Sequence, residues 1–130
     1  MEPGNIWSGS DALAVLTNPT ELAFSLGNLK GHYPIIVDGK EFADVEDYYQ
    51  QSKGDGDRSF AELEAIMVTG MVAKFRRYLQ IVEFIDDNGG IEWLEKCSHH
   101  VNGGRWEGDG LESPFIRCLV EGYRVAKASE

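Results

Sequence analysis

The longest regular pattern in this sequence is an amphipathic stretch that runs from Ser59 to Asp87. Its apolar residues recur at intervals of three and four, the spacing that places side chains on one face of an α-helix. These residues are Phe60, Leu63, Ile66, Met67, Met71, Phe75, Leu79, Val82 and Ile85. One helix of that length would be unusual, so we expect two or three helical pieces with a bend at Gly70. The chain has 130 residues, the size of one domain, and we expect residues 1–130 to form a single domain.

The segment HYPIIVDGKEF contains the one strong signal for a β-sheet. Aromatic and β-branched residues flank Asp38-Gly39, a dipeptide that favours a two-residue hairpin turn. After this hairpin, Asp44 can cap a helix that has Asp47 at its third position. The KGDGD stretch should end that helix near Gly54.

Capping signals indicate further short helices on both sides of this region. A helical stretch is expected around Asp11 to Leu16. In LTNPTELAFSLGN, Asn18 is the expected N-cap, Pro19 the first helical residue and Glu21 the acidic partner of a capping box. Another short helix is expected from Ile91 to Cys97.

The last helix should begin after Ser113, with Pro114 at its first position. Its apolar face is formed by Phe115, Ile116, Leu119, Val120 and Tyr123. The chain is therefore predicted to be a mostly helical α+β domain with a small β-hairpin or sheet.

The charge balance limits the partners of the protein. There are 22 acidic and 12 basic residues, which gives a formal net charge of −10. A field of this sign repels nucleic-acid phosphates, although a local basic pocket can still hold a nucleotide or one modified base. No apolar run approaches the roughly 20 residues that cross a bilayer, and the first nine residues lack the features of a signal peptide. We expect a cytoplasmic protein with no membrane partner, in which Cys97 and Cys118 are reduced.

The segment KFRRY, Lys74 to Tyr78, interleaves three basic and two aromatic residues. Such a pattern occurs on nucleic-acid-binding surfaces, but it is also that of an ordinary amphipathic helix. In an acidic chain we favour the second interpretation, with Phe75 inside and the charged side chains in solvent.

A polar stripe is predicted on the helix that follows the hairpin. Glu46, Gln50 and Lys53 are four and three residues apart, so they share one face, with Tyr49 at its edge. One interpretation is a solvated surface with an ordinary ion pair. The other is the rim of a cleft, because the stripe borders the apolar face of the helix.

The segment SHHVNGGRWEGDGLES is unusual for a simple connection. Trp106 lies among glycines and carboxylates, and it is either a plug of the core or a stacking platform for a base. Cys97, His99 and His100 are potential zinc ligands, but no distant second pair accompanies them, so we expect no metal. The two histidines either line a cleft or lie at the end of the preceding helix.

Two segments together resemble the NADAR family, small domains of NAD and ADP-ribose metabolism that include N-glycosidases. The first is VDGKEFADVEDYYQQSK, in which a hydrophobic-Asp-Gly hairpin precedes a helix with Glu, aromatic residues and Gln-x-x-Lys. The second is RWEGDGLESPFIRCLVEGYR, a tryptophan and glycine loop that leads into a final helix with an arginine near its end. The resemblance extends from about Tyr33 to Arg124.

The resemblance implies an N-glycosidase that hydrolyses the bond between ribose and a base in a ribosyl nucleotide, with ADP-ribose as the expected type of ligand. Glu46 is the implied catalytic carboxylate, because positive charge develops on C1′ of the ribose when this bond breaks. The expected partner is a nucleotide or a small ligand of the ADP-ribose type, and an ADP-ribosylated base in nucleic acid is a further candidate. No cofactor is expected. The expected substrate-binding residues are Tyr49, Gln50, Lys53, His99, His100, Trp106, Asp109 and Arg124.

A second hypothesis is a non-catalytic module that binds ADP-ribose or another nucleotide derived from NAD. It is favoured by two differences from the usual family motifs. Asp47 stands where family members usually have His, and Trp106-Glu107-Gly108-Asp109-Gly110 stands where they usually have Trp-Gly-x-Gly. The sequence leaves the oligomeric state open.

Overall fold

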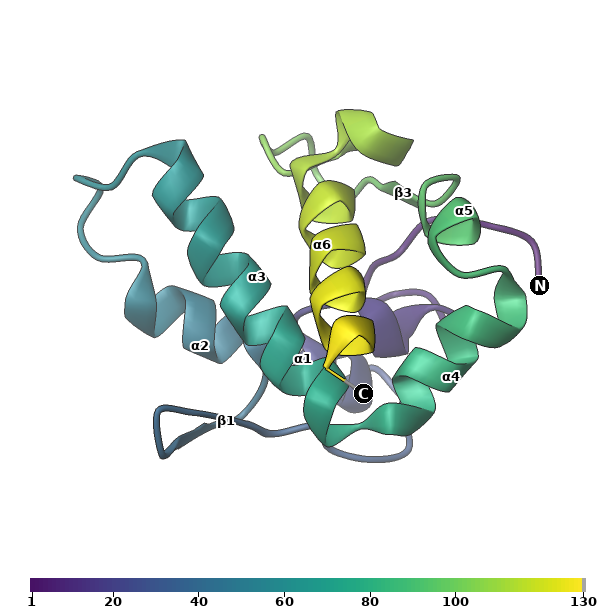
Figure 1. Cartoon of the computed structure of the whole chain (residues 1–130), viewed down its shortest axis with the longest axis horizontal. Coiled ribbons are helices and arrows are strands. Elements are labelled where there is room, and N and C mark those ends of the chain that lie inside the picture. The colour runs from purple at the N-terminus through teal and green to yellow at the C-terminus, as the bar shows by residue number, and fades with distance from the viewer. Residues whose placement is uncertain (130) are drawn as a thin grey trace.

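The computed structural model describes residues 1–129 and is built mainly from helices (Figure 1). Its two longest helices, α3 (Phe60–Arg77) and α6 (Pro114–Ala128), pack against each other along most of their length. The other helices are η1 (Ala14–Leu16), α1 (Thr20–Ser25), α2 (Val45–Ser52), α4 (Leu79–Asn88), α5 (Ile91–Leu94) and η2 (Gly110–Glu112). With two small antiparallel ladders, this is the mostly helical α+β fold that the sequence predicts.

The hydrophobic core lies between α3 and α6 and continues beneath α4, α5 and the N-terminal segment. Its fully buried side chains come from every part of the chain, including Ile6, Leu16, Ile35, Val45, Met71, Phe75, Ile85, Leu94, Ile116 and Leu119. Cys97 and Cys118 are also buried, and both are free thiols. Within residues 1–129, no helix combines the length and the apolar character that are needed to cross a bilayer.

Helix α3 is continuous through Gly70, where the sequence predicts a bend. That prediction is wrong, and the reason is packing: a Cβ atom at Gly70 would lie 3.0 Å from both Val45 and Tyr48 of α2. The glycine therefore allows α2 to approach α3 closely. The helix ends instead at Tyr78, whose φ of −119° and ψ of 76° separate α3 from α4.

The predicted hairpin forms as strands β1 (Ile35–Val37) and β2 (Lys40–Phe42). Asp38 and Gly39 have φ values of 51° and 79°, so both central residues of the turn are left-handed, as a type I′ turn requires. The paired residues Ile35 and Phe42 are buried, while the next pair, Ile36 and Glu41, faces outward. The hairpin therefore contributes one apolar face to the core.

A second ladder, which the sequence does not predict, joins β3 (Ser98–His99) to β4 (Gly108–Asp109). Ser98 also forms a bridge with Asn5, which brings the N-terminal segment to this ladder. Helix α5 consequently ends at Leu94 and does not reach Cys97 as predicted. The strands are only two residues long, so local sequence carries little sign of them.

The start of α1 differs from the predicted capping box. The N-cap is Pro19, and no side chain caps the helix from that position. The Asn18 amide group instead donates to the sulfur of Met67, and the backbone N–H of Glu21 donates to the carboxylate of Asp44 at 3.0 Å. The segment before it, where a short helical stretch is expected around Asp11 to Leu16, forms the 3₁₀ helix η1 from Ala14 to Leu16.

Asp44 and Ser113 are the predicted caps that do form. Asp44 accepts the backbone N–H of Asp47 at 2.8 Å, and Ser113 accepts that of Ile116 at 3.2 Å, with Pro114 in the first turn of α6. Because Asp44 also accepts from Glu21, one buried carboxylate caps the starts of both α1 and α2.

Lys74 is buried, which corrects the expectation that the basic residues of KFRRY are all in solvent. Its ammonium group donates to the carbonyl oxygen of Thr17 at 2.8 Å, and the Asp44 carboxylate interacts with it electrostatically. Burial lowers the pKa of Lys74 to about 7, and the charge of Asp44 only partly opposes this effect.

We predict that the free energy of unfolding increases as the pH rises from about 7 towards 10. In the unfolded chain Lys74 has its ordinary pKa of 10.5, so between these values the unfolded state binds more protons than the folded state. Urea denaturation of the wild type and of Lys74→Met at pH 7 and at pH 9.5 measures this effect. The wild type should gain stability relative to Lys74→Met, whereas the control Lys96→Met should follow the wild type. An equal pH dependence in the wild type and Lys74→Met would contradict the prediction.

Candidate functional site

A cleft of about 700 Å³ opens on the side of the molecule where α2, α3 and α6 begin or end. Its walls are formed by residues 17–19, one face of α2, the loop of residues 53–58, the first turns of α3, and His99, Trp106 and Phe115. The volume lies in the range that is usual for pockets that bind small molecules. Segments distant in sequence therefore meet in one cavity.

Six of the predicted site residues line this cleft: Glu46, Tyr49, Gln50, Lys53, His99 and Trp106. The polar stripe of α2 faces the cavity because Val45 and Tyr49 bury the adjacent face of the helix. Glu46 is half-buried, and its carboxylate accepts a hydrogen bond from the side-chain amide of Gln50 at 2.7 Å. The ion pair of the alternative interpretation does not form, because the partner of Glu46 is the neutral Gln50 and not Lys53.

Trp106 and Tyr49 form an aromatic wall of the cleft, and Phe60 packs against Trp106. Its ring centroid lies 5.7 Å from that of Tyr49, edge to face, and 4.9 Å from that of Phe60. The carbonyl oxygen of Trp106 accepts hydrogen bonds from the Ser113 hydroxyl at 2.7 Å and the Phe115 N–H at 3.2 Å. The indole is therefore fixed to the start of α6 and still exposes part of its surface to the cavity.

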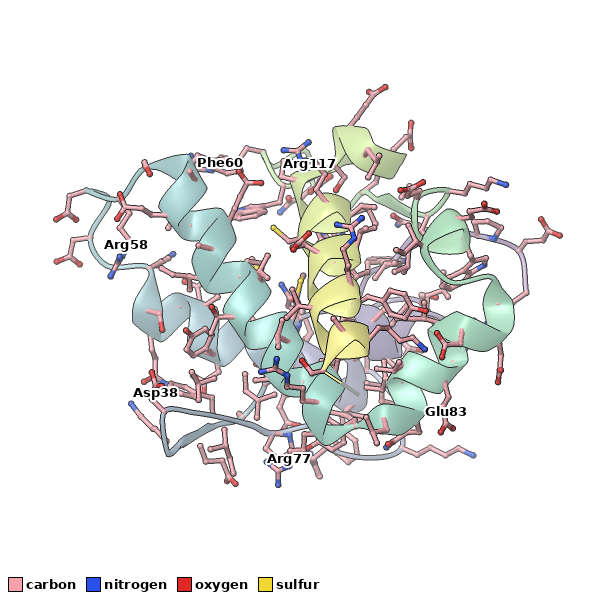
Figure 2. The ribbon with its side chains drawn as sticks, in the orientation of Figure 1. Asp38, Arg58, Phe60, Arg77, Glu83 and Arg117 are labelled. Carbon is pink, nitrogen blue, oxygen red and sulfur yellow. The ribbon has the colours of Figure 1, made fainter. Side chains whose placement is uncertain are left out.

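Three basic side chains border the cleft: Lys53, Arg58 and Arg105. Arg58 belongs to the loop between α2 and α3 (Figure 2) and forms a salt bridge of 3.7 Å with Glu62. The guanidinium group of Arg105 lies 4.5 Å above the ring of Phe60. In the described part of the chain, neither Lys53 nor Arg105 forms a salt bridge, although the carboxylates of Glu46 and Asp55 also line the cleft.

Arg58 and Arg105 were not predicted as site residues. Both are adjacent to segments noted in the sequence, since Arg58 follows KGDGD and Arg105 precedes Trp106. Glycine-rich stretches flanked by basic residues are the available signal, but only the fold shows that the two stretches face each other.

Burial affects the ionisation of two side chains of the cleft. It raises the pKa of Tyr49, an effect opposed by the positive charge of Arg105, and the phenol therefore remains protonated at neutral pH. It lowers the pKa of His99, whose imidazole is stacked on Phe115 with ring centroids 4.3 Å apart. The His99 ring is therefore neutral at pH 7.

Three predicted site residues lie outside the cleft. His100 directly follows strand β3, and its Nε2 lies 2.7 Å from the carboxylate of Asp109, another of the three, in an exposed pair outside the cleft. Arg124 pairs with Glu121 on the surface of α6 at 2.7 Å. It is nine residues after Phe115, the α6 residue in the cleft, and a helix advances about 13 Å over that distance.

Glu107 organises the loop next to Trp106. Its two carboxylate oxygens accept hydrogen bonds of 2.8 to 3.1 Å from the backbone N–H groups of Val101, Asn102, Gly103 and Gly104. These bonds lower the pKa of Glu107 to about 2. Glu107 therefore has a structural role in this chain.

Comparisons with known proteins are negative at both levels: the sequence matches no protein-family model and no curated protein, and the fold matches no solved structure. Across residues 1–129, no three His, Cys, Asp or Glu side chains gather closely enough to hold a metal ion.

We predict that Glu107→Ala increases amide hydrogen exchange at residues 101–104 and leaves exchange in α3 and α6 unchanged. The substitution removes the acceptor of four backbone N–H groups that no other bond protects. Hydrogen exchange followed by mass spectrometry or NMR measures the effect, and Glu112→Ala, at an exposed position nearby, is the control. Unchanged exchange in Glu107→Ala would mean that the loop is held by other contacts.

Proposed function

We propose that this protein hydrolyses the N-glycosidic bond of a ribosyl nucleotide of the ADP-ribose type. The observation that carries the proposal is the combination of groups in one cleft: a half-buried carboxylate, an aromatic wall, and basic residues without acidic partners. The two sequence motifs that resemble the NADAR family contribute Glu46, Gln50, Lys53 and Trp106 to this cleft. That residues from both motifs line one cleft supports the proposal beyond what the motifs alone provide.

The carboxylate has the chemistry that this reaction needs. Breaking the bond between C1′ and the base leaves positive charge on the ribose, and a nearby negative charge stabilises it. Glu46 is well placed for this role, because Gln50 holds one of its oxygens and the start of α2 holds its backbone. A side chain with few accessible rotamers loses little entropy when the substrate binds.

The basic residues suit the phosphate groups of such a nucleotide. Lys53 and Arg105 have no acidic partner in the described chain, so a phosphate can bind without displacing one. Arg58 can add a third contact from the loop between α2 and α3. These residues take the role that the family resemblance assigns in part to Arg124, which lies on the surface of α6.

The aromatic wall suits the base or the ribose. Base stacking on an aromatic side chain contributes about 1–3 kcal/mol per base. Trp106 is braced from behind by Phe60 and from the side by Tyr49, so its ring keeps a constant orientation. With a net charge of −10, the molecule favours a free nucleotide over a base in nucleic acid.

A non-catalytic nucleotide-binding module is the second candidate. It is favoured by Asp47, which occupies the place of the usual histidine of the family motif. The Asp47 carboxylate accepts hydrogen bonds from the Ala43 N–H and from the Gln51 side chain, both at 2.9 Å, and is therefore directed to the start of α2. Asp47 does not line the cleft.

We predict that Glu46→Gln abolishes turnover while the fold and nucleotide binding remain. The substitution keeps the shape of the side chain and removes the negative charge that stabilises C1′. Release of a free base from NAD, ADP-ribose, ADP-ribosylated guanine nucleotides and ribosylamine phosphates is followed by mass spectrometry. Glu83→Gln, at an exposed site on α4 (Figure 2), is the control and should retain wild-type activity. Binding by the wild type without release of any base would favour the second candidate.

We also predict that Lys53→Met and Arg105→Met each weaken ADP-ribose binding by about tenfold or more, since a hydrogen bond to a charged group contributes about 1.5–3 kcal/mol. Calorimetry measures the dissociation constants. The control is Arg117→Met, which removes an exposed arginine of α6 outside the cleft (Figure 2). If all three variants bind ADP-ribose with equal affinity, Lys53 and Arg105 do not contact its phosphates.

A further inference from the structure

The hydrogen bond of His99 determines which of its ring nitrogens carries a proton. Nδ1 lies 2.7 Å from the carbonyl oxygen of Ile6. A carbonyl oxygen only accepts hydrogen bonds, so Nδ1 must be the donor. Ile6 is fully buried, and water does not compete for this bond. In the neutral ring, Nε2 therefore carries the lone pair.

Packing leaves that lone pair available on the wall of the cleft. One face of the imidazole is stacked on Phe115, with an interplanar angle of 28°, and the Nδ1 edge is directed to Ile6. The remaining part of the ring includes Nε2, and His99 lines the cavity. Among residues 1–129, no group is hydrogen-bonded to Nε2.

Three titratable groups act on His99 from the segments around it: Glu46 from α2, Glu107 from the loop before β4, and His100 from the position directly after β3. The two carboxylates raise its pKa, and His100 and burial lower it, with burial as the largest effect. Glu46 and His99 both line the cleft. The ring is thus an unprotonated base in the same cavity as this carboxylate.

We propose that His99 is the general base of the hydrolysis, an inference that rests on the proposed function. Nε2 accepts a proton from water as the water oxygen forms a bond to C1′ of the ribose. The bond between C1′ and the base nitrogen breaks, and its electron pair leaves with the base. The imidazolium then returns the proton to the departing base, directly or through solvent, which restores the neutral ring.

This assignment separates two roles that a single carboxylate would otherwise combine. Glu46 stabilises the charge on C1′, while His99 exchanges the proton. The Ile6 carbonyl keeps its bond to Nδ1 in both states of the ring, and it stabilises the imidazolium that forms. The base is therefore oriented before the substrate binds.

The test compares pH profiles of kcat/KM for the wild type, His99→Gln and the control His32→Gln, an exposed histidine paired with Glu21. The substrate is whichever compound of the panel above releases a base. The activity of the wild type should fall at acidic pH as the ring becomes protonated. The apparent pKa of this decrease should lie below 6.5, the ordinary value of a histidine. His99→Gln should lose that acidic limb and about a hundred- to ten-thousand-fold in kcat/KM, and His32→Gln should match the wild type. Added imidazole should partly restore His99→Ala.

Three outcomes are decisive. If the wild type is active and His99→Gln keeps both its rate and its acidic limb, the inference is overturned and the proposed function stands. If the wild type releases no base from any compound, both are overturned. Independently of activity, ¹⁵N NMR of the imidazole should show a proton on Nδ1 and none on Nε2 at pH 7.5, and the opposite tautomer would overturn the inference.

Discussion

The buried carboxylate of Asp44 joins the segments on which the cleft depends. It accepts backbone N–H groups from Glu21 and Asp47, so it caps the starts of both α1 and α2.

 Nineteen residues, 26–44, separate the end of α1 at Ser25 from the start of α2 at Val45, and this side chain joins the two starts together with the hydrogen bond from the Glu46 N–H to the Asn18 carbonyl. Lys74 of α3 interacts electrostatically with the Asp44 carboxylate and donates to the Thr17 carbonyl. Two walls of the cleft, residues 17–19 and α2, are therefore set against α3 by buried polar contacts.

Burying the side chain of Lys74 reduces the stability of the fold, but its position offsets part of this cost. The Thr17 carbonyl has no helical partner, because η1 ends at Leu16 and α1 begins at Thr20. An unpaired buried carbonyl costs about 1–3 kcal/mol, and the Lys74 amine satisfies it even when neutral. The same contact fixes the backbone just before Asn18, which borders the cleft. Stability and the shape of the cavity thus depend on one group.

The other wall of the cleft, which includes Trp106 and His99, is held by hydrogen bonds to the start of α6 and to the N-terminal segment. Trp106 is bonded through its carbonyl to the start of α6, and His99 is bonded through its ring to the N-terminal segment. Glu107 closes the loop between them with four backbone hydrogen bonds. Aromatic, basic and acidic groups are thereby presented on supported backbone, which limits the reorganisation that a ligand requires.

The sequence by itself determined the features that depend on neighbouring residues: the Asp38-Gly39 turn, the caps at Asp44 and Ser113, the helical periodicity and the stripe on α2. Tertiary structure decided the rest, because the deciding partners are distant in the chain. Gly70 lies within a continuous helix because α2 packs on it, and the Asn18 side chain donates to the sulfur of Met67 and does not cap α1. Arg58 and Arg105 line one cavity although 46 residues lie between them. His99, paired with Gly108 in the second ladder, lines the cleft, whereas His100, directly after β3, lies outside it, and the local sequence does not distinguish the two.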